Sequence, residues 1–309
     1  MNNERQVLPR SLAIPKNWKT FNIGSLFSAF LYPALGVIGM VTAIIAGLLL
    51  DSVHLHWYYA PIVLVVMAVT LVVCNIGIGG LHRVWQHKAG ELKAPAQLIV
   101  LINCLIAMQG SIKDWINYHS QHHRFSDKPG DPHNPFESKS WAWVGWILFR
   151  DENDLKRPMP AWIKNNRIIS FGDRNHDILA LGIHLGIPLL IYGIVWACGG
   201  DLIITLLIHA AVVLGRAIQF HATVLGINVF GHFQMPKWFT YIMALLTGGE
   251  AFHDHHHDEP VSALHLPRKG FWNRIFDYNG TFLLICEKLK WAQDLKYPPM
   301  FENVKKLPA

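Results

Sequence analysis

The amino-acid sequence predicts an all-α integral membrane protein with four transmembrane helices, and three observations support this fold class. Hydrophobic residues make up 51% of the 309-residue chain and charged residues only 16%, a balance that is unusual for a soluble domain. Four apolar stretches each have the length of about 20 residues that crossing a bilayer requires. The polar segments beside these stretches contain three clusters of histidine.

The four predicted spans form two pairs. They cover residues 26–50, 58–80, 178–198 and 202–231. Each pair is joined by a short connector without lysine or arginine, so we expect two transmembrane hairpins. Lysine and arginine concentrate instead in the N-terminal arm, the middle polar segment and the C-terminal tail. By the positive-inside rule, both termini and the histidine clusters lie on the cytoplasmic side.

The remaining segments are expected to form a helical cap within a single membrane domain, residues 1–309. The cap comprises residues 82–177 and 232–309. Residues 94–112 include an apolar run of about eleven residues, which is too short to span, so we expect a re-entrant or interfacial helix there. The fourth span and its extension to residue 232 would reach about 46 Å at 1.5 Å per residue. Its end should therefore protrude from the lipid into the cap.

The charge distribution narrows the classes of partner. The formal net charge is +6, but the basic residues form no dense arm, so nucleic acid is not an expected partner. Membrane lipid, or an anionic acyl carrier such as a CoA thioester, fits better. The four cysteines show no CxxC spacing and are expected to be small packing residues rather than redox or disulfide partners.

Eight of the 18 histidines gather in three clusters: His82 with His87, His119 with His122 and His123, and His253 with His256 and His257. Imidazole is the commonest metal ligand in proteins. The HxxHH spacing occurs twice, and because positions i, i+3 and i+4 share a helix face, each triplet is expected to aim three ring nitrogens at one point. His82 and His87 share no face of a regular helix, so they either ligate one ion together, if the helix ends or distorts there, or ligate two different ions. The clusters predict a polynuclear metal site at a membrane surface.

A further pair, Asn228 and His232, lies at i and i+4 on the protruding end of the fourth span. This spacing favours His232 as another ligand. His221 precedes Asn228 by seven residues, so it is expected on the same face, where it would support a ligand or line a cavity rather than act as a ligand. A polar pair within an otherwise apolar run indicates a hydrated, functional face.

Other polar residues are expected to support the ligands through hydrogen bonds. Glu250 precedes the third cluster by three residues, but the chain lacks the paired ExxH motifs of carboxylate-bridged bundles, so Glu250 is expected behind a ligand rather than as one. His133 is expected in the same supporting role. The remaining histidines, including His255 and His265, are expected to be structural.

Taken together, these segments resemble the histidine motifs of membrane fatty acid desaturases, and within them the stearoyl-CoA, or Δ9, branch. The resemblance runs from about residue 80 to 260 and covers the order, spacing and flanking residues of the clusters. It rests on His82-Arg-Val-Trp-Gln-His87, Asp114-Trp115, His119-Ser-Gln-His122-His123, Asp131-Pro-His133-Asn134, Asn228-Val-Phe-Gly-His232 and Gly249-Glu250-Ala-Phe-His253-Asp-His-His256-His257.

This resemblance implies a non-haem di-iron centre that uses O2 as cosubstrate. Its nine histidine ligands would be His82, His87, His119, His122, His123, His232, His253, His256 and His257, with Asn228 contacting one iron through water. Glu250, His133 and Asp131 would support the ligands, and Gln109, Trp115 and Thr223 would border a bent acyl tunnel. The sequence departs from the animal enzymes in placing Thr223 one residue further from Asn228.

The expected activity is the O2-dependent desaturation of a long saturated acyl chain, with a CoA thioester at the Δ9 position as the expected substrate and an acyl lipid as the alternative. No flavin, nicotinamide or haem motif is present, so electrons must come from a separate donor such as a ferredoxin, a rubredoxin-type protein or cytochrome b5 with its reductase. A related di-iron hydroxylase or ketolase would use the same ligands. A metal transporter or haem electron carrier would instead place its histidines near the bilayer midplane.

Overall fold

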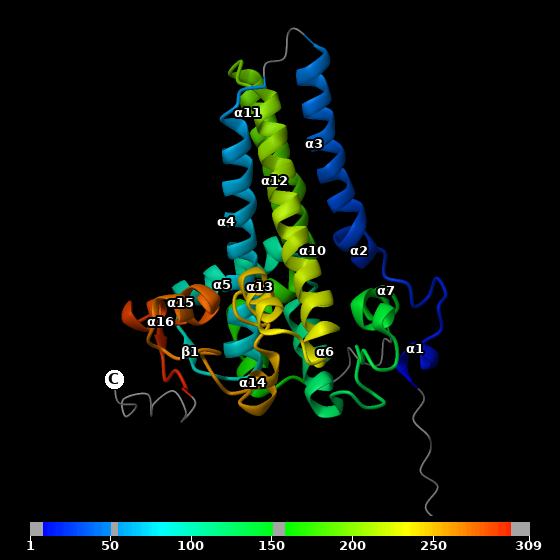
Figure 1. Cartoon of the computed structure of the whole chain (residues 1–309), viewed down its shortest axis with the longest axis vertical. Helices are drawn as coiled ribbons and strands as arrows, with labels where there is room; N and C mark the ends of the chain where they lie inside the picture. The colour runs from blue at the N-terminus through cyan, green and yellow to red at the C-terminus, as the bar shows by residue number, and fades with distance from the viewer. Residues whose placement is uncertain (1–8, 51–54, 151–157, 298–309) are drawn as a thin grey trace, which may run out of the picture.

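Four long helices stand side by side at one end of the molecule, and the short helices gather at the other end (Figure 1). This arrangement comes from a computed structural model that describes residues 9–50, 55–150 and 158–297. The helices long and apolar enough to cross a membrane are Ile23–Leu49, Tyr59–Gln86, His176–Ala197 and Leu202–His232. The prediction of four spans is confirmed, although the second span ends six residues later than the predicted residue 80.

A π-helical turn interrupts each of these four spans. The first span consists of α2 (Ile23–Leu26), η1 (Phe27–Leu31) and α3 (Tyr32–Leu49), and the second of α4 (Tyr59–Gly80) and η2 (Leu81–Gln86). The third consists of α10 (His176–Leu181), η5 (Gly182–Gly186) and α11 (Ile187–Ala197), and the fourth of α12 (Leu202–His221), η6 (Ala222–Ile227) and the 3₁₀ turn η7 (Phe230–His232). A π-turn inserts an extra residue into the helix and often marks a functional site. Two of them, η2 and η6, lie next to candidate ligands.

The segment 94–112 does not continue as a straight helix into the residues that follow. It forms α5 (Ala94–Ala107), and α6 (Ile112–Phe125) leaves it at an angle of 84°. Met108 and Gly110 adopt left-handed backbone conformations at the bend, and the Ser111 hydroxyl then caps α6 by accepting a hydrogen bond from the Asp114 amide. The pair has the geometry of a broken span or a re-entrant element.

The other elements are short and lie at the same end as α5 and α6. They are α1 (Arg10–Ala13), η3 (Trp141–Gly145), α7 (Trp146–Leu148), α8 (Ala161–Lys164), α9 (Arg167–Arg174), α13 (Lys237–Thr247), α14 (His253–Asp258), α15 (Phe271–Phe276) and α16 (Tyr278–Lys288). Strands β1 (Glu91–Leu92) and β2 (Ala292–Gln293) pair antiparallel, with Glu91 opposite Gln293 and Leu92 opposite Ala292. This pairing ties the C-terminal segment to the chain that follows the second span.

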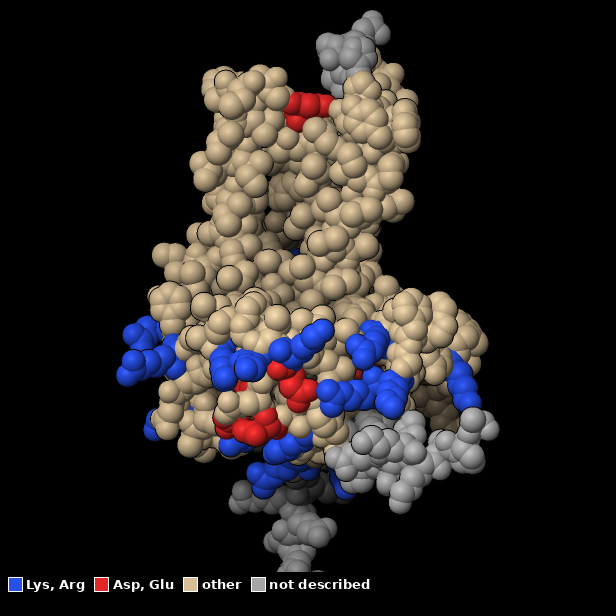
Figure 2. Space-filling view, turned by 90° about the vertical axis from the view of Figure 1, so that its left-hand side faces the viewer, with Lys and Arg blue, Asp and Glu red and all other residues tan. Residues whose placement is uncertain are grey.

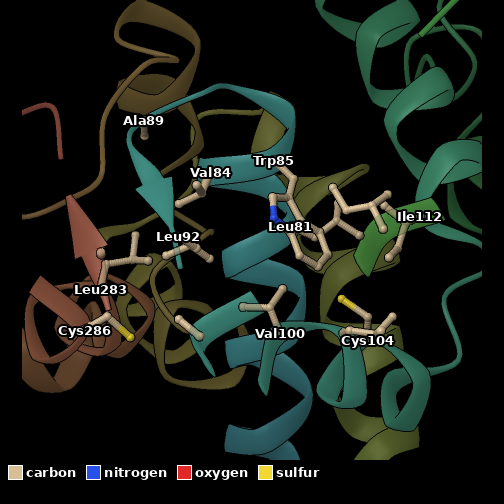
Figure 3. Packing of buried hydrophobic residues seen from close by; sticks show 14 of the residues in the cluster. Leu81, Val84, Trp85, Ala89, Leu92, Val100, Cys104, Ile112, Leu283 and Cys286 are labelled. Atoms are coloured by element: carbon tan, nitrogen blue, oxygen red, sulfur yellow. The ribbon is translucent and has the colours of Figure 1, made fainter. Parts of the chain in front are cut away.

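The main hydrophobic core lies beneath the end of the second span (Figure 3). It packs side chains from η2, α5 and α16 against each other, among them Leu81, Val84, Trp85, Val100, Cys104, Leu283 and Cys286. Each fully buried aliphatic side chain of this kind contributes about 1.5–3 kcal/mol. Three of the four cysteines are buried, as predicted, whereas Cys198 is exposed. The core fixes η2, which carries the first histidine cluster, against α5.

Charged residues are unevenly distributed along the long axis. On the face shown in Figure 2, lysine and arginine gather around the end that carries the short helices, and the surface of the long helices is largely free of them. Large hydrophobic residues are exposed along the spans, including Ile38, Leu64 and Leu190. An apolar exterior of this extent fits a bilayer rather than water.

Candidate metal centre

Nine histidine side chains from four separate segments converge at the end of the molecule where the short helices gather. They are the same nine that the sequence singles out. Their ring nitrogens form two groups, and within each group the candidate ligand atoms lie within 4.8 Å of one another. The first group consists of His82, His87, His119, His123 and His256, and the second of His122, His232, His253 and His257.

The two HxxHH triplets do not each aim at one point, so that expectation is wrong. In α6, His119 and His123 belong to the first group and His122 to the second. Successive residues of a helix are about 100° apart, so positions i and i+4 differ by about 40°, whereas i+3 and i+4 differ by about 100°. The i and i+4 rings therefore stay together, and the i+3 ring reaches the neighbouring group.

The π-turn η2 brings His82 and His87 to one side of the second span. In a regular α-helix, two residues five apart are separated by about 140°. Here the His87 amide donates to the His82 carbonyl at 3.1 Å, five residues back, which is the hydrogen-bond pattern of a π-helix. The ring centroids lie 5.1 Å apart. The helix distorts at this cluster, which is one of the alternatives that the sequence left open.

Carboxylates fix the tautomer of three of the rings. The Nδ1 of His82 donates to Glu250 at 2.6 Å, that of His122 to Asp131 at 3.0 Å, and that of His232 to Asp127 at 2.8 Å. With the proton on Nδ1, each neutral imidazole presents an unprotonated Nε2. These three Nε2 atoms point into the histidine groups, where other Nε2 atoms face them.

The spacing of the Nε2 atoms fits ligands around a metal ion. The Nε2 of His82 lies 3.0 Å from those of both His119 and His256, and the Nε2 of His253 lies 3.1 Å from that of His232. Facing lone pairs repel each other unless a cation lies between them. Two imidazole nitrogens at right angles, each about 2.1 Å from one ion, would be about 3.0 Å apart. The donor set therefore suits a transition metal that prefers imidazole.

Burial keeps the rings of the third cluster neutral. Desolvation lowers the pKa of His253 and His256 well below the ordinary value, and neighbouring histidines lower it further. Burial likewise lowers the pKa of His257 and of His87. A metal ligand must be unprotonated, so these rings are ready to bind an ion at neutral pH.

Glu250 is held by a buried ionic network. It accepts from Arg83 Nε at 2.9 Å and from Asn279 at 2.8 Å, in addition to His82. Arg83, which is 1% exposed, also pairs with Asp277 at 2.8 Å. Burial alone would raise the pKa of Glu250, but Arg83, His265 and His82 together outweigh burial and hold the pKa well below the ordinary value. Glu250 lies behind a histidine, where the sequence places it.

Sequence reasoning missed two residues of this supporting layer. His265 was expected to be structural, yet its buried ring lies 3.1 Å from Arg83 and 3.7 Å from Glu250. Burial, followed by the charge of Arg83, lowers the pKa of His265 to about 4. Asp127 was not singled out either. Its signal is its position four residues after His123 and four before Asp131, in a turn that folds back on α6.

The expected supporting residues Asp131 and His133 both lie against the second group. Asp131 is fully buried and also accepts from the backbone amides of Asp127 and His133 at 3.1 Å. The ring of His133 stacks on that of His122, with centroids 4.3 Å apart. Burial lowers the pKa of His133. This layer fixes the orientation of His122 from two sides.

A small cavity adjoins the histidine groups. Its lining includes the three residues assigned to the acyl tunnel, Gln109, Trp115 and Thr223, together with Asn228 and the candidate ligand His119. Its volume is about 70 Å³. Trp115 stacks on His119 at a centroid distance of 4.8 Å. The lining therefore brings the predicted tunnel residues beside the predicted ligands, and their contact with an acyl chain stays a prediction.

The π-turn η6 brings Thr223 and Asn228 to the same cavity. The Asn228 amide donates to the Thr223 carbonyl at 3.3 Å, five residues back. Both residues thus line the same cavity although they are five apart. The same turn rotates His221 away: its Nε2 lies 3.0 Å from the Ala29 carbonyl, and Trp143 donates to its Nδ1. The expectation that His221 is a cavity residue beside Asn228 is wrong because that expectation assumed a regular helix.

The fold and this site define a class: a helical membrane protein whose spans present clustered imidazoles for metal binding at one end. No protein-family model matches the chain. Among curated proteins, it is 27% identical to an acyl-CoA Delta(11) desaturase of Spodoptera littoralis, over 73% of this chain and 68% of that protein. It is 26% identical to an acyl-CoA Delta-9 desaturase of Acheta domesticus, over 81% and 72%, and 28% identical to an sn-1 stearoyl-lipid 9-desaturase of Synechocystis, over 75% and 72%.

These similarities support a membrane fatty acid desaturase family for the chain, and an oxidoreductase that acts as a fatty acyl desaturase. With these relatives, the four apolar helices indicate a multi-pass membrane protein.

Proposed function

We propose that this protein desaturates a long-chain saturated fatty acyl substrate, with O2 as cosubstrate, at a non-haem di-iron centre. The observation that carries the proposal is the convergence of nine histidines in two groups beside a cavity, in a chain similar to this family. The five histidines of the first group would hold one iron. The four of the second would hold the other, with Asn228 contacting an iron through water.

The reaction removes two hydrogen atoms from adjacent methylenes and leaves a carbon–carbon double bond. O2 takes up these hydrogens, together with two electrons and two protons from outside, to give two molecules of water. Bound iron supplies the oxidising power that breaks an unactivated C–H bond, which no side-chain acid or base can supply.

The side chains of this protein would hold the substrate and exclude water. Trp115, Trp146 and Phe220 line the small cavity. They would position one methylene pair against the two histidine groups, which we call the metal groups from here on. Fixing the reacting carbons in this way accounts for selectivity along a uniform chain, because proximity and orientation alone change rates by several orders of magnitude. Carboxylates behind His82, His122 and His232 would keep the ligands oriented.

The names of the relatives support a proposal for the position of the double bond and offer two kinds of acyl carrier. Desaturation at Δ9 is our specific proposal, because two of the three relatives described above carry that position in their names. Those names give a CoA thioester as carrier for two proteins and a stearoyl lipid for the third. Electrons would come from a separate donor of the ferredoxin, rubredoxin or cytochrome b5 type.

For the topology, we propose a single domain, residues 1–309, with two transmembrane hairpins and with both termini and the metal groups in a cytoplasmic cap. The concentration of lysine and arginine at the end that carries the metal groups supports this orientation. Cys198 is a natural reporter for it, since it is exposed at the opposite end whereas Cys74, Cys104 and Cys286 are buried. A membrane-impermeant maleimide added to intact cells should label the protein, and Cys198→Ser should abolish that labelling. Labelling only after the cells are opened would contradict the orientation.

The activity is tested by expressing the chain with a donor system and feeding deuterated stearate. Mass spectrometry of the extracted acyl chains should show loss of two deuterium or hydrogen atoms at one position, and the double bond should map to Δ9. A product with one added oxygen atom would instead indicate the hydroxylase alternative. Metal analysis of the purified protein should find iron, and an iron chelator should remove both iron and activity. A haem spectrum without non-haem iron would overturn the proposal.

A further inference from the structure

A second, larger cavity lies between the first, third and fourth spans. Its volume is about 1170 Å³, which exceeds the usual range for ligand sites of about 300 to 1,000 Å³. It shares Gln109, Asp114, Ile147, Arg150 and Phe220 with the small cavity beside the metal groups. The two cavities are therefore neighbours with a common wall.

The large cavity has two ends of different character. One end lies at the start of the third span, where Asp173, Arg174, Asn175, His176 and Asp177 form a polar mouth. The other runs along the fourth span between apolar walls, formed by Leu35, Gly36 and Gly39 of α3 and by Leu206, Ala210 and Val213 of α12. Between these two ends, the wall that the large cavity shares with the small cavity faces the metal groups.

This cavity faces the lipid-exposed side of the spans. Leu35 of α3 is 56% exposed, and Leu181 and Leu185 of the third span are 59% and 49% exposed, although all three line the cavity. Residues that both line a cavity and lie on the apolar exterior border its opening. A molecule dissolved in the bilayer can therefore reach this cavity without entering water.

The mouth carries both signs of charge: the exposed carboxylate of Asp177 lies 2.9 Å from His176, and Arg174 is a cation available to an anionic headgroup. Asp173 pairs with Lys113 at 3.2 Å and Asp114 with Arg150 at 3.4 Å. Within the described residues, Arg174 makes no ion pair and is exposed. Arg150 lines both cavities, and its buried Nε has no hydrogen-bond partner among the described residues. Guanidinium groups bind phosphate oxygens in paired hydrogen bonds.

We propose that this cavity binds a two-chain glycerophospholipid from the bilayer and presents one of its acyl chains to the metal groups. The headgroup would lie at the mouth near Arg174, one acyl chain in the apolar arm between α3 and α12, and the other across Gln109 and Phe220 toward the metal groups. A single-chain thioester would need the mouth and one arm only. The inference rests on the proposed function and specifies its carrier.

Binding is tested independently of catalysis by photo-crosslinking. The full-length protein is reconstituted in vesicles that contain a phosphatidylglycerol with a diazirine on one acyl chain, irradiated, and digested for mass spectrometry. Crosslinks should fall on α3, on the third span near Leu181 and Leu185, and on the residues shared by the two cavities. Crosslinks spread evenly over the outer faces of all four spans would overturn the proposal.

Two pairs of variants test the opening of the cavity from opposite walls. In each pair, one substitution narrows the opening and the other is a control outside the lining. Leu35→Trp and Leu185→Trp place a bulky ring in the cavity lining, whereas Ile38→Trp and Leu190→Trp make the same change on exposed positions of the same spans that do not line it. Each lining variant should cut crosslinking at the shared residues and phospholipid turnover by about tenfold, because a misplaced chain loses its alignment. The controls should match the wild type. Equal loss in lining and control variants would contradict the proposal.

The carrier is decided by offering two substrates. Vesicles are prepared with distearoyl phosphatidylglycerol as the only saturated lipid, or with unsaturated lipid and stearoyl-CoA added to the water phase. We expect turnover of the phospholipid, with Arg174→Gln weakening it more than Arg167→Gln, an exposed position on the same helix outside the cavity. Turnover of stearoyl-CoA alone, unaffected by the lining variants, would overturn this inference and leave the proposed desaturation standing. No desaturated product from either substrate would contradict the proposed function, and the crosslinks would still report on the cavity.

Discussion

The helices α6 and α14 carry the same HxxHH pattern but divide it in opposite ways. In α6 the i and i+4 histidines join the first group, and the i+3 histidine, His122, joins the second. In α14 the i and i+4 histidines join the second group, and the i+3 histidine, His256, joins the first. Each helix therefore contributes to both groups. In each helix, two histidines join one group and the third, which we call the crossing histidine or crossing ligand, joins the other group. The relative placement of the two helices therefore fixes both groups at once.

The two crossing histidines differ in how they are held. The Nδ1 of His122 donates to the fully buried Asp131. The Nδ1 of His256 is buried and has no hydrogen-bond partner among the described residues. His256 is held by packing instead, with its ring centroid 4.2 Å from that of His82 and 5.5 Å from that of His265. One crossing ligand is thus oriented by a carboxylate and the other by neighbouring rings.

Removing a crossing ligand should have the largest effect. We expect His122→Ala and His256→Ala each to lower activity more than about 100-fold, beyond the range of about 10 to 100-fold seen for residues that only support a ligand. His122→Ala leaves three histidines in its group and His256→Ala leaves four, so His122→Ala should lose more metal. Elemental analysis of the purified variants measures this. Equal metal loss would show that the number of histidines left in a group does not decide how much metal that group keeps.

Glu250→Gln should have the next largest effect, and it should lower stability as well as activity. Glutamine keeps the shape but leaves the buried Arg83 with one carboxylate instead of two, and removing one partner of a buried ion pair costs about 3 kcal/mol or more. We expect activity to fall about 10 to 100-fold, together with a lower melting temperature of the detergent-solubilised protein. A variant with lower activity but unchanged melting temperature would show that Glu250 acts on His82 alone.

The two aspartates of the second group should differ in strength. Asp131 is fully buried, whereas the side chain of Asp127 is 41% exposed, so water can replace the Asp127 carboxylate as the acceptor for His232. Asp131→Asn should weaken metal binding by about 10 to 100-fold, and Asp127→Asn by less than about tenfold. Metal titration of the apoprotein compares the two. The reverse order would mean that His232, rather than His122, depends on its carboxylate.

The spans and the nine histidines that converge were predictable because both depend on local signals. Runs of apolar residues reveal a bilayer-spanning helix, and the HxxHH spacing reveals which histidines share a helix end. The division of each triplet was not predictable, since it depends on how α6 and α14 face each other. The π-turns were hidden for the same reason: η2 gathers His82 and His87, and η6 turns His221 away. His265 joins the network from a distant loop through its contact with Arg83. No spacing of residues in the sequence indicates this contact.

The smallest effect on activity should come from substituting His255, which lies between candidate ligands in the sequence but belongs to neither group. His255 precedes His256 directly but belongs to neither metal group, since adjacent helical residues point about 100° apart. We expect His255→Asn to keep its metal content and to retain activity within about twofold of the wild type, the size of effect typical of substitutions away from a site. This variant is the matched control for His256→Ala, because both remove an imidazole from the same helix. If His255→Asn lost metal as well, the effect of His256→Ala would reflect damage to α14 rather than loss of a ligand, and the crossing arrangement would lose its support.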